Sequence, residues 1–394
     1  MEVNEKKKLL VVSFDAVGSE ELSLLDNRAN IWKLKNKGSL FENTKSIFVS
    51  NTYPVHASVS TGRLPEEHGL ISNTGLEPGE HSFWRWDSRQ LKTKTIFEAA
   101  HDAGIDSAAI MWPVTGHAGS SIRYNFPEIM AGPGQSTIWE YLKAGQIAFN
   151  FGSFLRFKSK LSLKDPSMQP EKDDFATSVL EDLLARKVKQ QPGLIMLHLT
   201  AYDDACHRFG KHSKESLDAL LMLDRNLGRI LKVVEPDTEV IVFSDHCQLN
   251  YSSFCDPDKS TMNDFANHGH MRFFFYYCGG TCFCFPRLIS ERRLCDLKSF
   301  CLGLEGVQRL VTENEMASSG FAAAKAAFGL CAREGFVFHN SIREKAEHGY
   351  SLDRNHYGTF ILTSWKEDSI CEDVIDVTRL AAQVLGLQYK RGII

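Results

Sequence analysis

The sequence has 394 residues, of which 43% are hydrophobic, and its formal net charge is −4 at pH 7. A chain of this length and composition can bury a large core, so we expect one α/β domain over residues 1–394 with an inserted region. The small negative charge gives no indication of binding to nucleic acids or anionic membranes through bulk electrostatics, and no stretch approaches the roughly 20 apolar residues that span a bilayer.

The first apolar run, Leu9–Phe14, ends at the acidic residue Asp15. This pattern predicts a buried strand that delivers a carboxylate to the edge of a sheet. Because the run is short and ends in an acid, we interpret it as a core strand and not as a signal peptide. All ten cysteines follow residue 200, and without a secretion signal they are expected to be reduced thiols of a cytoplasmic protein.

The segment Asn51–Asn73, NTYPVHASVSTGRLPEEHGLISN, is the most informative part of the chain. Thr52 precedes a Tyr-Pro turn, and the small residues of Ala57–Gly62 indicate a helix that is just beginning. A hydroxyl at a helix N-terminus lies among unpaired N–H groups that stabilise negative charge, which is where an enzyme would place a nucleophile for attack on a phosphate. The alternative is that Thr52 only caps the helix.

Three later segments place acidic or histidine side chains next to apolar runs that predict strands. The side chains are Asp203 and His207, Asp245 and His246, and His348; the runs are Leu194–Leu199, Val240–Phe243 and Phe360–Thr363. Carboxylates and imidazoles are preferred ligands of zinc and similar divalent ions, and α/β sheets gather their sites at strand ends. Together the segments predict a metal site.

Strand-like runs alternate with helical patterns over much of the chain. Besides the runs above, Ser107–Met111 predicts a strand, and the helical patterns are Ala29–Lys37, Thr95–Ala103, Phe175–Lys189, Ser216–Val233 and Val374–Leu385. This alternation predicts a mostly parallel sheet with helices on both faces.

Residues 250–345 depart from this alternation, and we interpret them as an insertion that borders the active site. Within it, Glu291–Leu302 and the Ala-rich Phe321–Leu330 have helical patterns. The stretch FFFYYCGGTCFCF predicts a β-hairpin that turns at Gly279–Gly280. A zinc cluster formed by Cys278, Cys282 and Cys284 is the alternative for that stretch.

These motifs resemble those of the nucleotide pyrophosphatase/phosphodiesterase family of the alkaline phosphatase superfamily. The resemblance runs from Leu9 to about Gly386, and its motifs are Thr-aromatic-Pro-x-His at Thr52–His56, TG…P…HG at Thr61–Gly69, Asn73, MWP at Met111–Pro113, D-x-x-x-H at Asp203–His207, SDH at Ser244–His246 and HGY at His348–Tyr350. The sequence departs from the family pattern at Cys247, where Gly is usual, and in HLTAY, which lacks the acidic pair typical of the animal enzymes.

The resemblance implies an alkaline-phosphatase-like α/β/α sandwich and a site for two divalent metal ions. By position, Asp15, Thr52, Asp245 and His246 would hold one ion, and Asp203, His207 and His348 the other; Thr52 would be the nucleophile, and Asn73 would bind a phosphate oxygen. A second His-Gly pair, His268–Gly269, is an alternative source of the last ligand. Such a mixed His/Asp set suits Zn²⁺ best, although Mn²⁺ or Fe would also fit.

The function implied by the resemblance is a phosphodiesterase or nucleotide pyrophosphatase that forms a phosphothreonine intermediate on a small phosphodiester or nucleotide substrate. A phosphonate hydrolase, phosphomonoesterase or phosphomutase on the same scaffold is the alternative, followed by an inactive binding protein. No arginine is close to Thr52 in sequence, and Arg63 is expected to be structural. Because a monoester favours an arginine clamp, this favours diesters. Phe83, Trp84 and Trp86 are candidates either for stacking a base or for packing.

Overall fold

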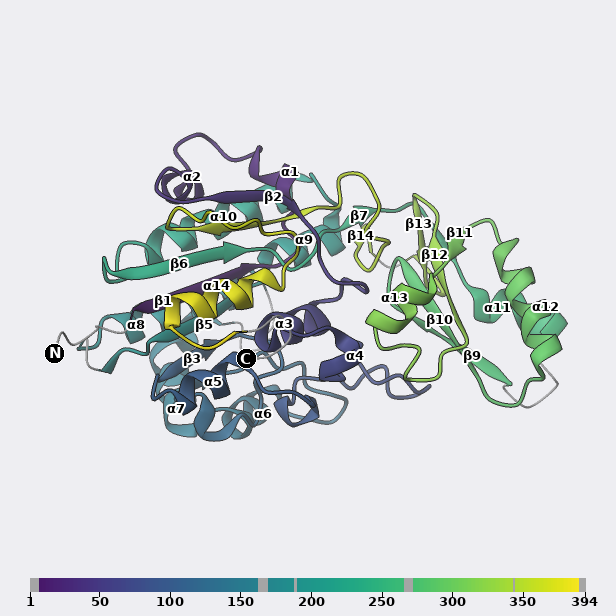
Figure 1. The fold of residues 1–394 in the computed structure, drawn as a ribbon, viewed down its shortest axis with the longest axis horizontal. Helices are drawn as coiled ribbons and strands as arrows, with labels where there is room; N and C mark the ends of the chain where they lie inside the picture. Colours follow the sequence, from purple (N-terminus) through teal and green to yellow (C-terminus); the bar gives the residue numbers. More distant parts are fainter. Residues whose placement is uncertain (1–6, 162–168, 188–189, 266–271, 343, 390–394) are drawn as a thin grey trace.

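The computed structural model of the chain describes residues 7–161, 169–187, 190–265, 272–342 and 344–389. Its centre is a seven-stranded sheet (Figure 1), whose strands in spatial order are β2 (Leu40–Thr44), β15 (Thr359–Thr363), β6 (Thr238–Phe243), β1 (Lys8–Phe14), β5 (Leu194–Leu199), β3 (Ser107–Ile110) and β4 (Tyr124–Phe126). The strands from β6 to β4 are parallel, whereas β15 runs antiparallel to both β6 and β2. The predicted mostly parallel sheet is therefore confirmed.

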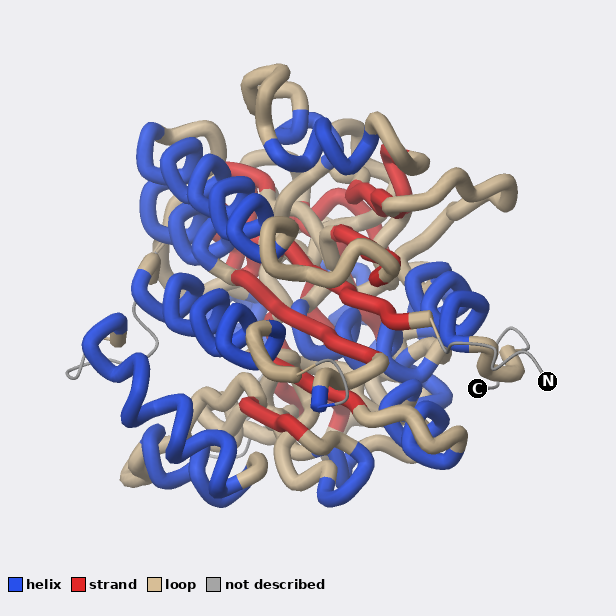
Figure 2. Tube along the Cα trace, turned by 90° about the vertical axis from the view of Figure 1, so that its left-hand side faces the viewer, coloured by secondary structure: helices blue, strands red, loops and turns tan. Residues whose placement is uncertain are grey.

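Helices cover both faces of this sheet, as the end view in Figure 2 shows. One face packs against α2 (Asn30–Lys35), α6 (Thr137–Ala144), α7 (Ile147–Phe157), α8 (Glu171–Leu184), α9 (Ala201–Phe209) and α10 (Lys214–Ile230); the other packs against α3 (Thr52–Thr61), α5 (Ile96–Asp102) and α14 (Asp376–Leu385). Both faces need a cover because successive side chains of a strand point to opposite sides of the sheet. In β1, Leu10 and Val12 pack on the first of these faces, and Leu9 and Val11 pack on the second. This is the predicted α/β/α sandwich.

Most predicted helices occur near their predicted ends, but α8 is shifted towards the N-terminus. It begins at Glu171, four residues before Phe175, and ends at Leu184. Glu171, Asp173 and Asp174 lie in its first turn, where negative charge interacts favourably with the helix dipole. The apolar periodicity alone did not reveal this acidic first turn.

A second, antiparallel sheet forms a separate layer at one end of the molecule, on the right in Figure 1. Its strands in spatial order are β11 (Val307–Leu310), β12 (Phe328–Ala332), β10 (Thr281–Pro286) and β9 (Phe273–Tyr277), and it carries α11 (Pro257–Phe265), α12 (Glu291–Leu302) and α13 (Glu313–Ser318). The predicted hairpin is confirmed, with Cys282 opposite Tyr277 and the turn at Gly279–Gly280.

The helix predicted over Phe321–Leu330 is wrong, because Phe328–Ala332 forms the interior strand β12. A Cβ atom on Gly329 would lie 2.6 Å from Val311 Cγ2 and 2.9 Å from Phe283 Cδ1, so the strand packs closely against its neighbours only because this residue has no side chain. The alanines of 322–327 lie in a turn and a short loop before this strand, and pairing on both sides holds Phe328–Ala332 extended.

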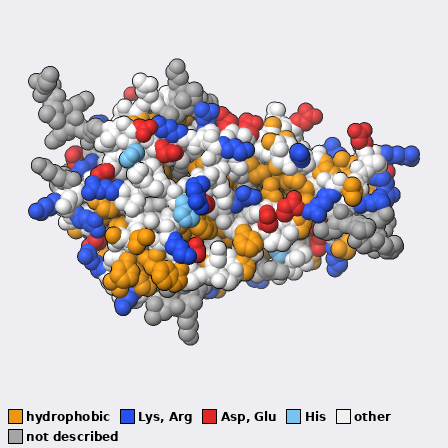
Figure 3. All heavy atoms as spheres, turned by 90° about the horizontal axis from the view of Figure 1, so that it is seen from below, with side chains coloured by type: hydrophobic (Ala, Val, Ile, Leu, Met, Phe, Trp, Pro, Cys, Tyr) orange, Lys and Arg blue, Asp and Glu red, His pale blue; other side chains and the backbone are white. Residues whose placement is uncertain are grey.

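Short elements complete the described chain: α1 (Ser19–Leu22), α4 (Pro65–His68), β7 (Leu249–Asn250), β8 (Ser253–Cys255), β13 (Phe336–Phe338) and β14 (Ala346–Glu347), with 3₁₀ turns at Ser88–Gln90, Gly119–Ser121 and Lys158–Lys160. No described helix combines the length and apolar character needed to cross a membrane. On the face shown in Figure 3, basic and acidic side chains are interspersed, and hydrophobic side chains gather in clusters between them.

All ten cysteines are unpaired thiols. Cys278, Cys282 and Cys284 are buried within the hairpin and its turn. Among the described residues, no group of side chains placed to hold a metal ion includes a cysteine. The hairpin interpretation of this stretch therefore prevails over the zinc-cluster alternative.

Candidate active site

The carboxyl ends of three neighbouring parallel strands bring the predicted acidic and histidine side chains together. β1 lies between β5 and β6. Asp15 follows β1, α9 with Asp203 follows β5, and Asp245 follows β6. Because parallel strands end at the same edge of a sheet, residues more than 200 positions apart in sequence meet there.

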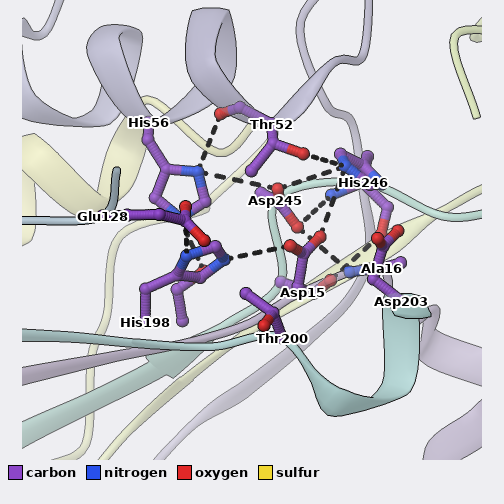
Figure 4. A network of polar contacts seen from close by, with 12 residues as sticks. Asp15, Ala16, Thr52, His56, Glu128, His198, Thr200, Asp203, Asp245 and His246 are labelled. Atoms are coloured by element: carbon purple, nitrogen blue, oxygen red, sulfur yellow. Dashed lines mark hydrogen bonds and ion pairs between the residues drawn. The ribbon is translucent and has the colours of Figure 1, made fainter. Parts of the chain in front are cut away.

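Thr52 is the first residue of α3, so the predicted helix N-terminus is present and Tyr53 and Pro54 belong to the helix itself. Its Oγ1 lies 3.2 Å from His246 Nε2, and the N-cap position of α3 belongs to Asn51 and not to Thr52. The capping alternative for Thr52 therefore has no support in the geometry, because the hydroxyl faces His246 (Figure 4).

His56 holds Thr52 against the sheet. Its Nδ1 lies 2.8 Å from the carbonyl oxygen of Thr52, and its Nε2 lies 3.0 Å from Ser13 Oγ on β1. A carbonyl only accepts, so Nδ1 carries the proton. Burial lowers the pKa of His56 to about 3, and the ring is neutral at physiological pH. This histidine of the Thr-aromatic-Pro-x-His motif therefore fixes the backbone of Thr52.

The first group of ligand-type side chains consists of Asp15, Asp245 and His246. His246 Nε2 lies 3.4 Å from Asp15 Oδ1 and 3.3 Å from Asp245 Oδ2. Asp245 Oδ1 accepts the N–H groups of Ala16 and His246, whereas Asp245 Oδ2 and Asp15 Oδ1 are buried without a hydrogen-bond partner among the described residues.

Electrostatics make this first group suitable for a cation. Burial, followed by the charges of Asp245 and Asp203, raises the pKa of Asp15 well above its usual value. Two buried carboxylates that face the same group, here those of Asp15 and Asp245, are unfavourable unless a positive charge lies between them. The donor set of two free carboxylate oxygens, an imidazole nitrogen and the Thr52 hydroxyl therefore fits a divalent ion.

The second group consists of Asp203, His207 and His348. His207 Nδ1 donates to the carbonyl oxygen of Ala346 over 3.0 Å, and His348 Nδ1 donates to Asn51 Oδ1 over 3.0 Å. Both rings thus keep Nε2 free as a ligand atom, and His207 Nε2 lies 3.4 Å from Asp203 Oδ2. Fixing one imidazole nitrogen by a hydrogen bond is how metal-binding histidines are oriented, so these residues also fit a divalent ion.

The structure places Asn73 beside the site, but it does not describe His268, the alternative source of the last ligand. Asn73 Oδ1 accepts the N–H of Tyr53 over 2.9 Å, which leaves its amide NH₂ as the donor, and Asn73 lines the same cavity as His207 and His348. His268 lies outside the described residues.

A buried chain of charged groups that the sequence patterns did not reveal reaches Asp15. Lys172, in the first turn of α8, pairs with Glu128. Glu128 Oε2 lies 3.3 Å from His198 Nδ1, and His198 Nε2 lies 3.1 Å from Asp15 Oδ2. Figure 4 shows His198 between the two carboxylates. The only indication in the sequence is a polar residue within the apolar run LIMLHL.

The pKa shifts of this chain follow from its burial and charges. Burial alone would lower the pKa of His198, but the carboxylates of Glu128 and Asp15 outweigh it and raise the pKa to about 10. Burial would raise the pKa of Glu128, but Lys172 and His198 hold it well below its usual value. His198 is therefore a cation with a counter-charge on each side.

Two adjoining cavities form a cleft above the site. One is lined by Asp15, Thr52, Lys172, Asp203 and Arg208; the other lies between the sandwich and the second sheet and is lined by Asn73, Tyr276, Tyr277, Phe338 and His348. Trp84, His207 and Glu344 line both.

The structure shows which of the candidate aromatic and arginine side chains reach the cleft. Of the three candidate aromatics, Trp84 lines the cleft and packs edge-on against Tyr53, with 5.2 Å between ring centroids. Trp86 packs against His117, and Phe83 is half exposed. Arg208, distant from Thr52 in sequence, enters the same cavity but pairs with Asp204, whereas Arg63 pairs with Glu67.

The family model described as type I phosphodiesterase / nucleotide pyrophosphatase matches residues 9–275. The chain is similar to venom phosphodiesterase 2 of Crotalus adamanteus, with 24% identity over 322 residues that make up 78% of this chain and 34% of that protein. It is also 24% identical to human ectonucleotide pyrophosphatase/phosphodiesterase family member 1 over 229 residues, which are 55% of this chain and 20% of that protein. The chain thus spans about a third or less of the length of these relatives.

Two solved structures share the fold over nearly their whole length. The structure of murine ectonucleotide pyrophosphatase/phosphodiesterase 5 matches with a TM-score of 0.69 and 18% identity, covering 97% of this chain and 96% of that one. Phosphonoacetate hydrolase from Sinorhizobium meliloti 1021, in complex with phosphonoacetate, matches with a TM-score of 0.72 and 14% identity, covering 96% of each chain. The fold is thus alkaline-phosphatase-like, as predicted.

Proposed function

Because the chain belongs to the type I phosphodiesterase / nucleotide pyrophosphatase family, we propose that it hydrolyses phosphodiester or pyrophosphate bonds with two divalent metal ions and with Thr52 as the nucleophile. The observation that carries this proposal is the position of the Thr52 hydroxyl, 3.2 Å from His246 Nε2 at the N-terminus of a helix. This hydroxyl lies next to a group of buried ligand-type side chains whose carboxylate oxygens have no other partner.

Asp15, Asp245, His246 and Thr52 would hold one ion, and Asp203, His207 and His348 the other. When bound, two such ions neutralise the charge of the phosphate and make a hydroxyl or a water nucleophilic at neutral pH. The mixed carboxylate and imidazole ligands suit Zn²⁺ best, with Mn²⁺ or Fe as alternatives.

The residues of the chain supply attack, orientation and binding. Thr52 Oγ1 gives up its proton and attacks phosphorus in line, and the bond to the leaving oxygen breaks, so that this oxygen departs with its electron pair and takes up a proton. The phosphate, still carrying its second ester group, is then bound to Thr52 as a phosphothreonine ester, and water hydrolyses that bond and restores the hydroxyl. His56 keeps the backbone of Thr52 fixed during both steps through its 2.8 Å contact with the carbonyl oxygen. The amide NH₂ of Asn73, left free when its Oδ1 accepts the N–H of Tyr53, would donate to a phosphate oxygen.

The two ester groups of the substrate would lie in the two cavities of the cleft. The cavity beside the second sheet offers the aromatic side chains Trp84, Tyr276, Tyr277 and Phe338, which suit an organic group better than a bare oxyanion. Residues 250–345 are accordingly an insertion in a single catalytic domain, and they form one wall of the substrate cleft.

A substrate panel with and without chelator tests the proposal. We expect bis-p-nitrophenyl phosphate to be hydrolysed, activity to be lost with EDTA, and activity to return when Zn²⁺ is restored. Phosphonoacetate and p-nitrophenyl phosphate are the comparison substrates, since a phosphonate hydrolase or a monoesterase would turn them over faster. Chelator-resistant hydrolysis of the diester would contradict the two-metal proposal, and inactivity on every substrate would indicate a binding protein.

A further inference from the structure

The buried chain of Lys172, Glu128 and His198, here called the His198 chain, has no part in the mechanism above. Its members come from three separate elements: Lys172 from α8, Glu128 from the segment after β4, and His198 from β5. The side chains of Lys172 and Glu128 are 7% and 6% exposed, and that of His198 is fully buried. Burying a Lys–Glu ion pair together with a polar imidazole is costly, so the arrangement calls for an explanation beyond filling the core.

The end of the His198 chain distinguishes the two oxygens of Asp15. Oδ2 of Asp15 lies 3.1 Å from His198 Nε2. Oδ1 lies 3.4 Å from His246 Nε2, is buried, and has no hydrogen-bond partner among the described residues. One oxygen of Asp15 therefore contacts the His198 imidazole, and the other faces the first group of ligand-type side chains.

We propose that His198 is a positioning residue: by pairing with Oδ2 of Asp15 it turns Oδ1 towards Asp245 and His246, and Glu128 with Lys172 keeps the imidazole ring in place. This inference rests on the proposed function, because it gives Asp15 its role as a ligand of the first ion. Supporting contacts of this kind orient ligands, and their loss typically weakens metal binding about 10–100-fold.

The first turn of α8 also supports the second group, but through a different residue. Asp173, next to Lys172, accepts the backbone N–H groups of Thr200 and Ala201 over 3.0 and 2.9 Å. These residues begin α9, which carries Asp203 and His207. Asp173 is therefore a matched control, because its loss should affect the second group and leave the first intact.

The test is a titration of metal-free full-length protein with Zn²⁺ in competition with a chelator of known affinity. Two equivalents should bind to the wild-type protein; His246→Ala should remove the first-group step, and His348→Ala the second-group step. We expect His198→Gln to weaken the first-group step by about 10–100-fold and to leave the other within about twofold. Asp173→Asn should show the opposite pattern, and His101→Gln, at an exposed histidine, should change neither step.

If His198→Gln does not fold, a double variant tests whether the His198 chain positions Asp15. Glu128→Gln with Lys172→Met removes a whole buried ion pair and leaves no unpaired charge, which is the change that folded proteins tolerate best; it too should weaken only the first-group step. Wild-type affinities in folded His198→Gln, or equal weakening of both steps, would overturn the inference alone. A wild-type protein that binds fewer than two equivalents would overturn the two-metal proposal and this inference with it.

Discussion

Asn51 and His348, 297 positions apart in sequence, are joined by a 3.0 Å hydrogen bond from His348 Nδ1 to Asn51 Oδ1. Asn51 directly precedes Thr52, and His348 belongs to the second group of ligand-type side chains. Gly349 permits the close approach of this segment, because its φ is +75° and a Cβ atom there would lie 1.9 Å from the carbonyl oxygen of Cys278. The nucleophile segment and the second group are thus held in one arrangement.

His348→Ala should therefore lose about one metal equivalent and most of the activity. Asp203 and His207 would be left as the only ligand-type side chains of their group, and two protein ligands hold zinc poorly. Metal analysis of the purified variant is the measurement. The comparison variant is His268→Ala, which should keep metal content near two; the reverse pattern would assign the last ligand to the His268–Gly269 pair.

Thr52→Ala should keep the fold and both metal ions but abolish turnover. The hydroxyl is the only atom of this side chain that can attack phosphorus, and Asp15, Asp245 and His246 remain to bind the ion. Thr52→Ser should keep measurable activity, since it removes only a methyl group. Activity is measured with bis-p-nitrophenyl phosphate alongside metal content, and wild-type turnover by Thr52→Ala would exclude Thr52 from the mechanism.

His68 should make the fold sensitive to acid. Its Nδ1 accepts a hydrogen bond from the N–H of Leu70 over 3.2 Å, so the ring proton is on Nε2. This Nε2–H donates a hydrogen bond to Ser58 Oγ over 2.9 Å. Burial lowers the pKa of His68 from 6.5 to about 3. A histidine with a depressed pKa contributes stability that is fully present above pH 6.5 and is lost as the pH falls towards 3, because the unfolded chain takes up the proton first.

Between pH 8 and pH 5 this loss amounts to about 2 kcal/mol of unfolding free energy. Urea unfolding at pH 8 and pH 5 gives the drop in unfolding free energy of each protein. This drop should be smaller in His68→Gln than in the wild-type protein by about 2 kcal/mol. Other groups titrate equally in both proteins, so the difference isolates His68. An identical pH dependence in the two proteins would mean that His68 is not held neutral.

The sandwich and the two groups of ligand-type residues could be predicted because their sequence patterns are local. A parallel strand buried on both faces is a continuous apolar run, and the acidic residue at its end is the point where the chain reaches the edge of the sheet. Asp15 and Asp245 follow this rule, whereas Asp203 lies in the first turn of the helix that comes after β5. Their assembly into two groups also needed the strand order, which the family resemblance implied and the structure shows.

The remaining features depend on contacts that no local pattern encodes. His198 looks like one polar residue in an apolar strand, and its partners Glu128 and Lys172 come from distant segments with no regular periodicity. Likewise, Phe328–Ala332 is a strand only because β10 and β11 pair with it on either side. The entry of Arg208 into the cleft follows from its place in the last turn of α9, which the distance to Thr52 in sequence does not reveal.

The last prediction concerns the charge of the substrate: diesters should be preferred over monoesters by at least about tenfold in kcat/KM, a transition-state difference near 1.4 kcal/mol. A monoester brings a second negative charge, which an unpaired cation would have to offset. Among the described residues, the lysine and arginine side chains that line the catalytic cavity are already paired, Lys172 with Glu128 and Arg208 with Asp204. A diester instead places an organic group against Trp84 and Tyr276. Both p-nitrophenyl esters should be assayed on one preparation at saturating metal, and a monoester rate equal to the diester rate would favour a phosphatase or mutase.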